Sequence, residues 1–372
     1  MRIGKAIVNS IWENDAEKAN DILDTAGNII RNGGTVVFPT ETVYGLGANA
    51  LDPRAAKRIY KAKGRPLDNP LIVHISNEEM LYDIVREVSD EAKRLIQKYW
   101  PGPLTLIFYK KEIVPSETTG GLETVAVRMP SNKIARKLID EAGVPIAAPS
   151  ANLSGRPSIT KGRYAVEELA ERVDMIILSE DSDIGIESTV VDLTTRLPIV
   201  LRPGKISQSD ILHTIAESEE DFLHKLKEFE ELMENKNSNQ SAPKSPGMKY
   251  RHYSPNAHVF LMSKEEILGY LAVKNDTPGP QEEDLLQMAL KGSDAQKIKV
   301  FTTDDHLSEY GEYGISLGND GEQIGKNLFT FLRQMDEQGV EIIFCEDFEA
   351  DKTSEFLSAV MNRIRKAAEN ID

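Results

Sequence analysis

The first 216 residues of the chain alternate short apolar runs with longer amphipathic stretches. The short runs predict β-strands, and the stretches with a helical period predict helices. We expect strands at 35–38, 71–75, 104–108, 124–129, 145–148, 174–179, 188–193 and 199–202, and helices at 16–32, 53–61, 78–98 and 132–142. Because some strands follow one another directly and others are joined by helices, the pattern predicts a mixed α/β sheet.

The end of the chain has a simpler pattern. Apolar runs at 257–262, 297–302 and 340–345 are separated by helical patterns near 264–273, 322–336 and 353–367. This alternation predicts βαβ crossovers and a small, Rossmann-like parallel sheet. Before it, an acidic amphipathic helix at 217–233 leads into residues 234–247, which contain no Val, Ile, Leu, Phe, Trp or Tyr and have linker composition. We therefore expect a domain over 1–216, a helix with an interdomain linker or flap over 217–255, and a C-terminal domain over 256–372.

Composition narrows the class of protein. With 40% hydrophobic and 28% charged residues, the chain is typical of globular proteins. Cys345 is the only cysteine, which excludes an intrachain disulfide and Cys₄ or Cys₂His₂ zinc sites, and favours a reducing compartment. No apolar stretch approaches the roughly 18 residues that cross a bilayer, and Glu13 and Asp15 interrupt the N-terminal run too early for a secretory signal. We expect a cytoplasmic protein without a membrane partner.

The net charge of −16 is unevenly distributed. Residues 1–216 hold 27 Lys and Arg against 29 Asp and Glu, so nearly all of the excess negative charge belongs to the remainder of the chain. Because neutralising phosphates takes a basic surface, direct binding of nucleic acid should be weak or absent. Six cations do lie between Arg54 and Arg65, and for most of them a solvated helix face is the simpler interpretation.

Several familiar motifs are absent or out of context. The segment from Gly45 to Ala50 fits G-x-G-x-x-A, but the preceding strand ends at Phe38 and the next helix begins only at Pro53. A dinucleotide-binding turn needs its glycines to open the helix, so the match is rejected. The sequence contains no Walker P-loop, no G-x-S-x-G and no H-E-x-x-H, and its six histidines form no i,i+4 pair. Walker-type nucleotide binding, elbow-serine hydrolysis and zincin chemistry therefore have no support.

What remains is a set of polar segments at strand ends, namely PTETVYGLG, KGRPLDNPLIVHI, VRMP, APSANLSGRPS and ESTVVDL. Arginine can hold a carboxylate or phosphate bidentately, lysine acts as a point charge, and serine hydroxyls with backbone N–H groups complete an anion cradle. These segments favour an anion-rich ligand bound without a P-loop. Each residue alone also has a structural interpretation: His74 in an apolar strand can be a satisfied core histidine, and Arg128 can be structural.

Together, these segments resemble a known family. FPTETVYGLG, KGRPLDNPLIVHI, WPGPLT, VAVRMP, PIAAPSANLSGRPS and ESTVVDL followed by LRPG are similar to the YrdC family, whose members make threonylcarbamoyl-AMP for the threonylcarbamoyladenosine modification of tRNA. SPGMKYRHYSP and AVMNRIRKAA match the long form, which adds a smaller C-terminal domain through a linker. Several independent stretches carry this resemblance, and together they cover nearly the whole chain.

The resemblance implies a fold and a reaction. The fold would be a YrdC-like twisted mixed α/β sheet with a concave active-site surface, followed by a Rossmann-like parallel α/β domain. The enzyme would be a nucleotidyltransferase, an L-threonylcarbamoyladenylate synthase, that makes threonylcarbamoyl-AMP and pyrophosphate from ATP, L-threonine and bicarbonate. Its product would pass to the tRNA threonylcarbamoyl-transfer machinery. Mg²⁺ would be carried on the ATP phosphates, and because it keeps several waters the sequence names no metal ligand.

The resemblance also implies site residues. Lys63 and Arg65 match the catalytic cations. The expected ATP contacts are Lys63, Arg65, Asn69, Ser150, Asn152, Ser158, Arg202 and Tyr250. The expected L-threonine contacts are Thr42, His74, Thr124, Arg128, Ala148 and Ser188, with Arg128 on the α-carboxylate.

Tyr250 belongs to segment 245–255, which we expect to fold as a flap over ATP with Arg251 or His252 near the phosphates. The alternative is that its aromatic residues dock the C-terminal domain.

Two other functions compete with the synthase. A non-catalytic RNA-binding module would use the same cations, but the net charge argues against it. A carbamoyltransferase of larger architecture lacks support because the chain contains neither acylphosphatase-like nor zinc-finger segments.

Overall fold

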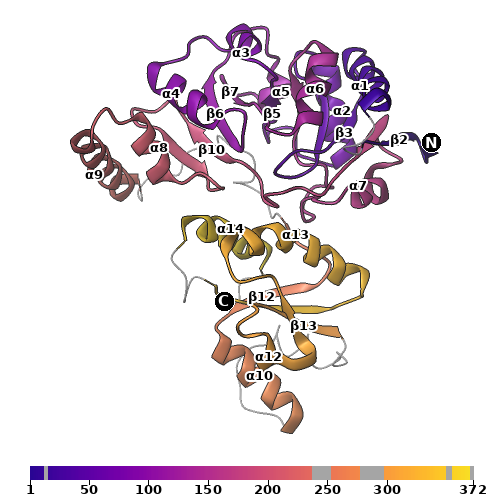
Figure 1. Ribbon diagram of the computed structural model, residues 1–372, viewed down its shortest axis with the longest axis vertical. Helices are drawn as coiled ribbons and strands as arrows, with labels where there is room; N and C mark the ends of the chain where they lie inside the picture. Colours follow the sequence, from indigo (N-terminus) through magenta and orange to yellow (C-terminus); the bar gives the residue numbers. More distant parts are fainter. Residues whose placement is uncertain (12–15, 237–252, 277–296, 349–353, 369–372) are drawn as a thin grey trace. The chain divides into compact units, whose positions relative to one another are not determined.

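The computed structural model describes residues 1–11, 16–236, 253–276, 297–348 and 354–368. They belong to two compact units, one of residues 1–154 and 158–250 and the other of residues 155–157 and 251–372 (Figure 1). Among the helices that the structure describes, none is both long and apolar enough to pass through a bilayer.

The first unit is built on one eleven-stranded sheet. Its strands are β1 (Arg2–Ile3), β2 (Ala6–Ser10), β3 (Val36–Phe38), β4 (Gly45–Asn49), β5 (Ile72–His74), β6 (Leu104–Tyr109), β7 (Thr124–Arg128), β8 (Ile146–Ala147), β9 (Met175–Leu178), β10 (Thr189–Asp192) and β11 (Ile199–Arg202). Their order across the sheet is β1-β2-β9-β3-β4-β8-β5-β7-β6-β10-β11. Parallel pairs such as β5–β7 and β6–β10 alternate with antiparallel pairs such as β6–β7 and β3–β4. The predicted mixed sheet is therefore confirmed.

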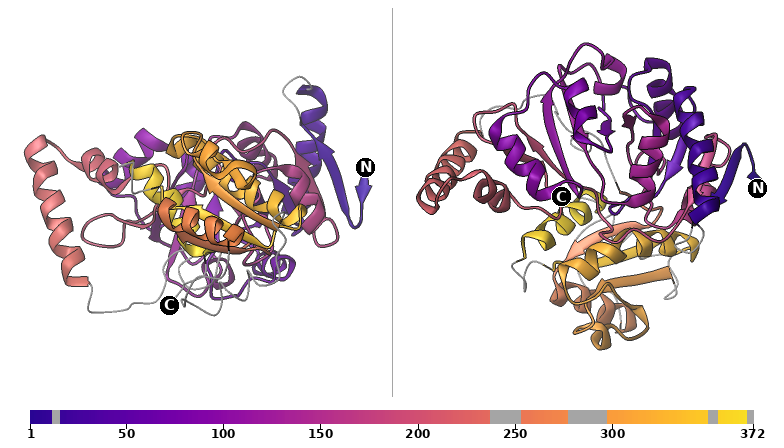
Figure 2. Two further views of the ribbon diagram at one scale, coloured as in Figure 1. Left: turned by 90° about the horizontal axis from the view of Figure 1, so that it is seen from below. Right: turned by 45° about the horizontal axis from the view of Figure 1, so that its top comes forward.

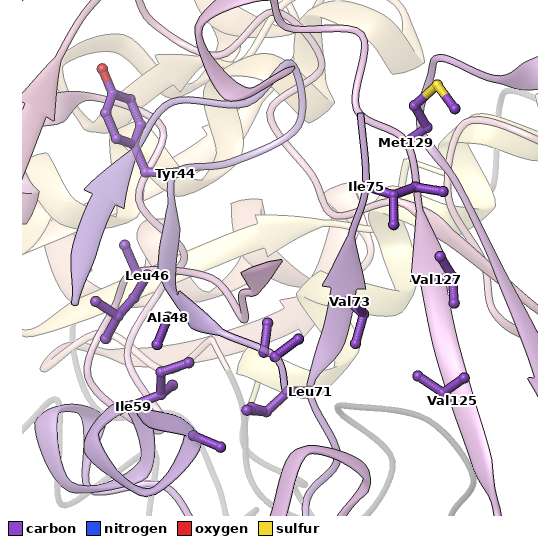
Figure 3. Packing of buried hydrophobic residues seen from close by; sticks show 14 of the residues in the cluster. Tyr44, Leu46, Ala48, Ile59, Leu71, Val73, Ile75, Val125, Val127 and Met129 are labelled. Carbon is purple, nitrogen blue, oxygen red and sulfur yellow. The ribbon is translucent and has the colours of Figure 1, made fainter. Parts of the chain in front are cut away.

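Helices cover both faces of this sheet because strand side chains alternate between the faces. They are α1 (Ala16–Arg31), α2 (Pro53–Lys63), α3 (Glu78–Ile84), α4 (Asp90–Tyr99), α5 (Ser116–Thr119), α6 (Lys133–Ala142), α7 (Gly162–Leu169), α8 (Gln208–Ile215) and α9 (Glu219–Lys236). On β3, Val36 and Phe38 pack with α1 and α6, whereas Val37 faces the larger core under α2, α4 and α7. Figure 3 shows that larger core, from Tyr44 and Leu46 to Val127.

Helix α2 places two expected site residues. Asp52 caps its N-terminus by accepting from the Arg54 N–H, and proline occupies the first turn. Gly64 ends the helix in the left-handed region, at φ +64°, where glycine is favoured. Lys63 is consequently the last helical residue, and Arg65 follows immediately after the turn.

The structure differs from the expected elements in several places. The expected helix at 78–98 is two helices, because α3 ends where Val85 bridges to Lys110 and Ser89 caps α4. β4 was not among the expected strands, and it begins inside the polar segment PTETVYGLG. β1, β2, α7 and α8 were not expected at all.

The glycines of the rejected dinucleotide motif have a packing role. A Cβ on Gly47 would lie 2.7 Å from Phe38 Cε1 and 2.7 Å from Ile146 Cγ2, so β4 needs glycine to fit beside β3 and β8.

The second unit contains a four-stranded, entirely parallel sheet in the order β12-β15-β13-β14. Its strands are β12 (His258–Met262), β13 (Ile298–Thr302), β14 (Gly314–Ser316) and β15 (Ile342–Glu346). Its helices are α10 (Lys264–Asp276), α12 (Leu307–Tyr310), the 3₁₀ turn η2 (Gly311–Tyr313), α13 (Gly321–Glu337) and α14 (Glu355–Ala367) (Figure 2). The expected parallel sheet is confirmed, and β14 is an additional strand.

Of the expected flap, residues 245–252 lie outside the described residues. Tyr253 is buried and stacks on Phe329 of α13 with ring centroids 5.2 Å apart. This ring therefore packs within the second unit, and the flap itself stays a prediction.

Candidate active site

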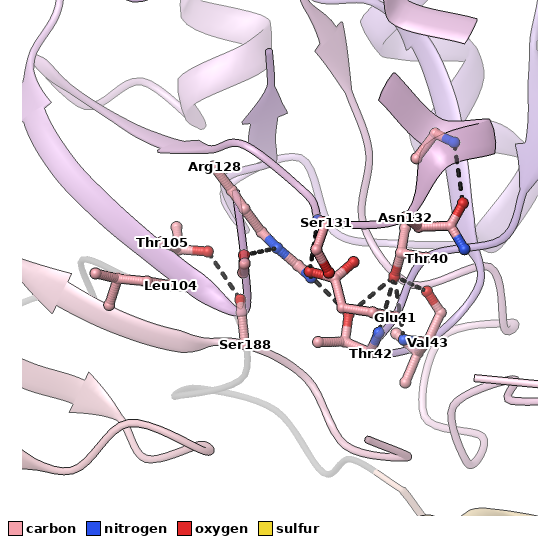
Figure 4. A network of polar contacts seen from close by, with 12 residues as sticks. Thr40, Glu41, Thr42, Val43, Leu104, Thr105, Arg128, Ser131, Asn132 and Ser188 are labelled. Carbon is pink, nitrogen blue, oxygen red and sulfur yellow. Dashed lines mark hydrogen bonds and ion pairs between the residues drawn. The ribbon is translucent and has the colours of Figure 1, made fainter. Parts of the chain in front are cut away.

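Arg128 is held in a fixed orientation at the end of β7. It is only 4% exposed, and each of its three nitrogens lies close to an oxygen atom of the surrounding chain (Figure 4). Nε donates to Gly102 O at 3.2 Å, Nη1 donates to Thr42 Oγ1 at 2.9 Å, and Nη2 lies 2.6 Å from Glu41 Oε1. A buried guanidinium held at several points is organised to bind a planar anion.

The turn that carries Thr42 is organised by the hydroxyl of Thr40. Thr40 Oγ1 donates to Val43 O at 2.6 Å and accepts from the N–H groups of Thr42 and Val43. Because its hydrogen is used, the 2.9 Å contact between the two threonine hydroxyls must be a hydrogen bond that Thr42 donates. Thr42 can therefore only accept from Arg128 or from a ligand.

Glu41 completes this group as a buried carboxylate. Its Oε1 accepts from the Ser131 N–H at 3.0 Å, and its own carbonyl accepts from the Ile184 N–H at 2.9 Å. Burial raises the pKa of Glu41, but the charge of Arg128 and the hydrogen bond from Ser131 outweigh burial and leave the pKa below its usual value. Glu41 is therefore ionised at neutral pH.

His74 ends β5 and lies opposite Arg128 in the parallel register of β5 and β7. Its Nδ1 lies 3.2 Å from Ile72 O, and Phe38 contacts the ring edge-on. Burial, and after it the positive charge of Arg128, lowers the pKa of His74 to about 3. The imidazole is therefore neutral at physiological pH and cannot act as a second cation for a carboxylate.

A second buried arginine lies across the neighbouring strands. Arg202, at the end of β11, donates from Nε to Ser188 O and from Nη2 to Ser188 Oγ, both at 3.0 Å. Ser188 Oγ also bonds Thr105 Oγ1 at 2.8 Å, and Thr105 lies directly opposite Arg128 in the β6–β7 pair. The sheet thus brings Thr42, Arg128, Ser188 and Arg202 into one region.

Lys63 fixes the loop that follows β8. Its ammonium donates to the carbonyls of Ser150 and Asn152, and its own carbonyl accepts from the Ser154 N–H at 2.9 Å. The expected grouping of Lys63, Ser150 and Asn152 is therefore present in the structure.

Arg65 is paired with Asn69. Its Nη2 donates to Asn69 Oδ1 at 2.6 Å and to Pro70 O at 3.0 Å, and its Nε donates to Asn69 O at 3.2 Å.

The remaining expected residues are Ser158, Ala148, Thr124 and Tyr250. Ser158 is buried and donates to Glu187 Oε1 at 2.5 Å. Ala148 is buried just after β8. Thr124 begins β7 opposite Tyr109, about 13 Å along the strand from Arg128 at ~3.3 Å per residue, and within the described part of the chain no hydrogen bond or ion pair joins it to the Thr42–Arg128 group. Tyr250 lies outside the described residues. All these binding roles stay predictions.

The residues that the structure describes contain no group of three or more His, Cys, Asp or Glu side chains that could hold a metal ion. Mg²⁺ bound mainly by phosphates and water would need few protein ligands, and the expectation that ATP carries it stays a prediction.

Sequence reasoning missed the acidic members of the site. Glu41 and Glu187 are both buried, and each contacts an expected ligand-binding residue. A signal was present for each: both acids lie inside the motifs PTETVYGLG and ESTVVDL, directly beside Thr42 and Ser188. An acid that must be buried needs a cationic or hydrogen-bonding partner.

Two family models match the chain. Residues 28–204 match the model described as "Telomere recombination", and residues 214–369 match the model described as "Threonylcarbamoyl-AMP synthase, C-terminal domain".

Curated proteins and solved structures agree with these matches. The chain is 43% identical over 343 residues to the threonylcarbamoyl-AMP synthase of Pyrococcus abyssi, covering 92% of this chain and 93% of that protein. It is 40% identical over 347 residues to the threonylcarbamoyl-AMP synthase of Bacillus subtilis, covering 92% of each. The structure of P. abyssi Sua5 complexed with L-threonine is similar with a TM-score of 0.76 and 39% identity, covering 98% of each chain.

Proposed function

The chain belongs to the threonylcarbamoyl-AMP synthase family in its long, two-domain form, and from this premise we propose that it makes threonylcarbamoyl-AMP and pyrophosphate from ATP, L-threonine and bicarbonate. The resemblance inferred from the motifs and the fold class that it implied are thereby confirmed. The observation that carries the proposal is the relative of 39% identity whose structure holds L-threonine, together with the buried Arg128–Thr42 pair of this chain.

The reaction joins anions. Threonine and bicarbonate would form N-carboxy-threonine with loss of one water molecule, and the new carboxylate oxygen then bonds the α-phosphorus of ATP. The bond from that phosphorus to the β-phosphate bridging oxygen breaks, and pyrophosphate leaves. Such a reaction needs fixed cations and hydrogen-bond donors more than a strong base, so positioning and charge stabilisation should supply most of the rate.

We assign Arg128 and Thr42 to threonine, with Arg128 on the α-carboxylate, and Ser188 to the same substrate. Two observations support this assignment: Arg128 is buried at the end of β7, and the Ser188–Thr105 pair lies opposite it. Arg202 contacts Ser188 directly, which supports an ATP site adjoining the threonine site.

Lys63 and Arg65 would meet the nucleotide phosphates near the loop 150–154, and Mg²⁺ would arrive on those phosphates. We place the catalytic steps in residues 1–216, which residues 217–255 join to the C-terminal domain at 256–372. The acyl adenylate would then pass to the enzymes that modify tRNA.

Pyrophosphate release tests the function. The intact protein is incubated with ATP and Mg²⁺, and L-threonine and bicarbonate are omitted singly and together. We expect release only when both are present, and a product of the mass of threonylcarbamoyl-AMP. Pyrophosphate release that does not depend on threonine would refute the proposal. Threonine-dependent release would also refute it if the product were threonyl-AMP, which contains no carbon from bicarbonate. ¹³C-labelled bicarbonate distinguishes these outcomes by mass.

A further inference from the structure

The ion pair of Glu41 and Arg128 contains buried atoms that the described residues leave unsatisfied. Glu41 Oε2 accepts no hydrogen bond within the described chain, and Arg128 Nη2, although it lies 2.6 Å from Glu41 Oε1, donates none of suitable geometry there. Both atoms are inaccessible to solvent. Buried charged atoms are normally hydrogen-bonded, so two exceptions in one ion pair indicate the place of a ligand that supplies the partners.

Arg128 keeps hydrogen-bond donors that suit a carboxylate ligand. A guanidinium carries five N–H donors. Nε uses its hydrogen on Gly102 O, and Nη1 uses one hydrogen on Thr42 Oγ1. One hydrogen on Nη1 remains, and Nη2, whose 2.6 Å contact with Glu41 Oε1 lacks hydrogen-bond geometry, lies beside it. These two nitrogens form the end of the fork that holds a carboxylate bidentately.

A carboxylate alone does not satisfy Glu41. Oε2 of an ionised carboxylate can only accept, so it needs a donor from the ligand. The Glu41–Arg128 pair is already neutral, and a simple anion would add an uncompensated negative charge beside a buried carboxylate. A zwitterion adds no net charge, and an α-amino acid carries its donor and its acceptor on adjacent carbons.

We propose that Glu41 Oε2 accepts a hydrogen bond from the α-nitrogen of L-threonine while Arg128 holds the α-carboxylate. Glu41 thereby selects α-amino acids over acids without the amine, and it orients the nitrogen that is to be carboxylated. After carboxylation, that nitrogen keeps one hydrogen, so the contact persists. This inference rests on the proposed function and adds a specificity-determining residue to it.

The hydroxyl of Thr42 does not replace this contact. Its hydrogen is donated to Thr40, and it already accepts from Arg128, so it offers one remaining lone pair without charge. The depressed pKa of Glu41 keeps the carboxylate ionised at neutral pH, which makes it the stronger acceptor for an ammonium group.

The first test compares ligands on the wild-type protein. L-Threonine and (R)-3-hydroxybutanoate, which keeps the carboxylate and the hydroxyl but lacks the amine, are titrated by calorimetry. Loss of a charge-assisted hydrogen bond predicts binding of the analogue weaker by about 10-fold to 100-fold. Binding of the two ligands within about threefold of each other would overturn the proposal, because Glu41 would then have no donor to accept from.

The second test uses Glu41→Gln. We expect threonine affinity to fall about 10-fold or more, while affinity for (R)-3-hydroxybutanoate stays level or rises because its carboxylate no longer meets a buried negative charge. Equal losses of affinity for the two ligands would show that Glu41 only positions Arg128. They would refute the proposed contact between Glu41 and the amine. Glu346→Gln is the matched control, since Glu346 is 4% exposed against 6% for Glu41 but lies in the second unit. It should leave the ratio of the two affinities unchanged.

Folding and function are checked separately. Circular dichroism and the ATP affinity of Glu41→Gln show whether the variant is folded, and if it is not, the wild-type ligand comparison still decides. If the wild type shows no threonine-dependent pyrophosphate release, the proposed function fails. If it does, but the amine makes no difference to binding, only this inference fails.

Discussion

Replacing Arg128 with lysine separates the charge of the guanidinium from its geometry. Arg128 makes three fixed contacts, to Gly102 O, Thr42 Oγ1 and Glu41 Oε1. A lysine ammonium keeps the ion pair with Glu41 but is a single point charge on a flexible chain, so it cannot hold the other two contacts and a substrate carboxylate together. One lost charge-assisted hydrogen bond contributes about 1.5–3 kcal/mol, which predicts a rise in the threonine KM of about 10-fold to 100-fold.

Arg128→Lys is preferable to Arg128→Ala because it should destabilise the folded protein less. Arg128→Ala would leave the buried Glu41 carboxylate without its partner and should cost about 3–5 kcal/mol of unfolding free energy, enough to confuse loss of activity with loss of fold. Arg128→Lys keeps the charges balanced, and its unfolding free energy should stay much closer to that of the wild type.

Initial rates of pyrophosphate release measure the effect. Threonine is varied at saturating ATP and bicarbonate, and ATP is then varied at saturating threonine. The threonine KM should rise far more than the ATP KM. Arg54→Lys is the matched control, because Arg54 is 90% exposed and, among the described residues, pairs with Asp52 at the start of α2; it should change neither constant. Equal rises in both KM values for Arg128→Lys would refute its assignment to the threonine carboxylate.

Three further predictions follow from other contacts. Arg65→Ala should remove most activity and weaken ATP binding, since a guanidinium near the phosphates contributes about 1.5–3 kcal/mol per charge-assisted bond; a folded variant with near-parental kinetics would contradict the phosphate assignment. His74 makes stability depend on pH: its folded pKa of about 3 lies below the ordinary 6.5, so the unfolded chain binds a proton first and stability is lost as pH falls below 6.5. Between pH 6.5 and pH 5 this loss is about 2 kcal/mol, and urea titrations should show it in the wild type and show it reduced in His74→Gln; an identical pH dependence in the two proteins would argue against the shift. Gly47→Ala places a Cβ 2.7 Å from Phe38 Cε1 and should cost about 1–3 kcal/mol, whereas Gly269→Ala, where a Cβ meets nothing within 4 Å, should not destabilise; equal thermal midpoints for the two variants would contradict the close packing of β4.

Local signals in the sequence determined most of the elements. Asp52, Pro53 and Gly64 mark the start and stop of α2, and the structure places these residues at those positions. The apolar runs became the central strands, and the strand–helix alternation after residue 256 became a parallel sheet. These features depend on residues within a few positions of one another, so the chain alone specifies them.

Motifs in the sequence also identified the family and named Thr42, Arg128, Ser188 and Arg202, which the structure brings into one region. A family resemblance identifies such residues one at a time, as separate motif matches along the chain. It does not say which of them touch, in which direction a hydroxyl donates, or whether a histidine is charged.

Only the tertiary structure decided those points. Glu41 and Arg128 are 87 positions apart in the sequence, and their 2.6 Å contact exists because the turn after β3 meets the end of β7. The neutrality of His74 likewise comes from burial beside that guanidinium. Desolvation and Coulomb interaction depend on distances through space and on exclusion of water, and neither is encoded in the residues next to a given position. The order of the strands in the sheet places β5, β7 and β6 side by side. That order therefore sets the distances between these side chains and their exclusion from water.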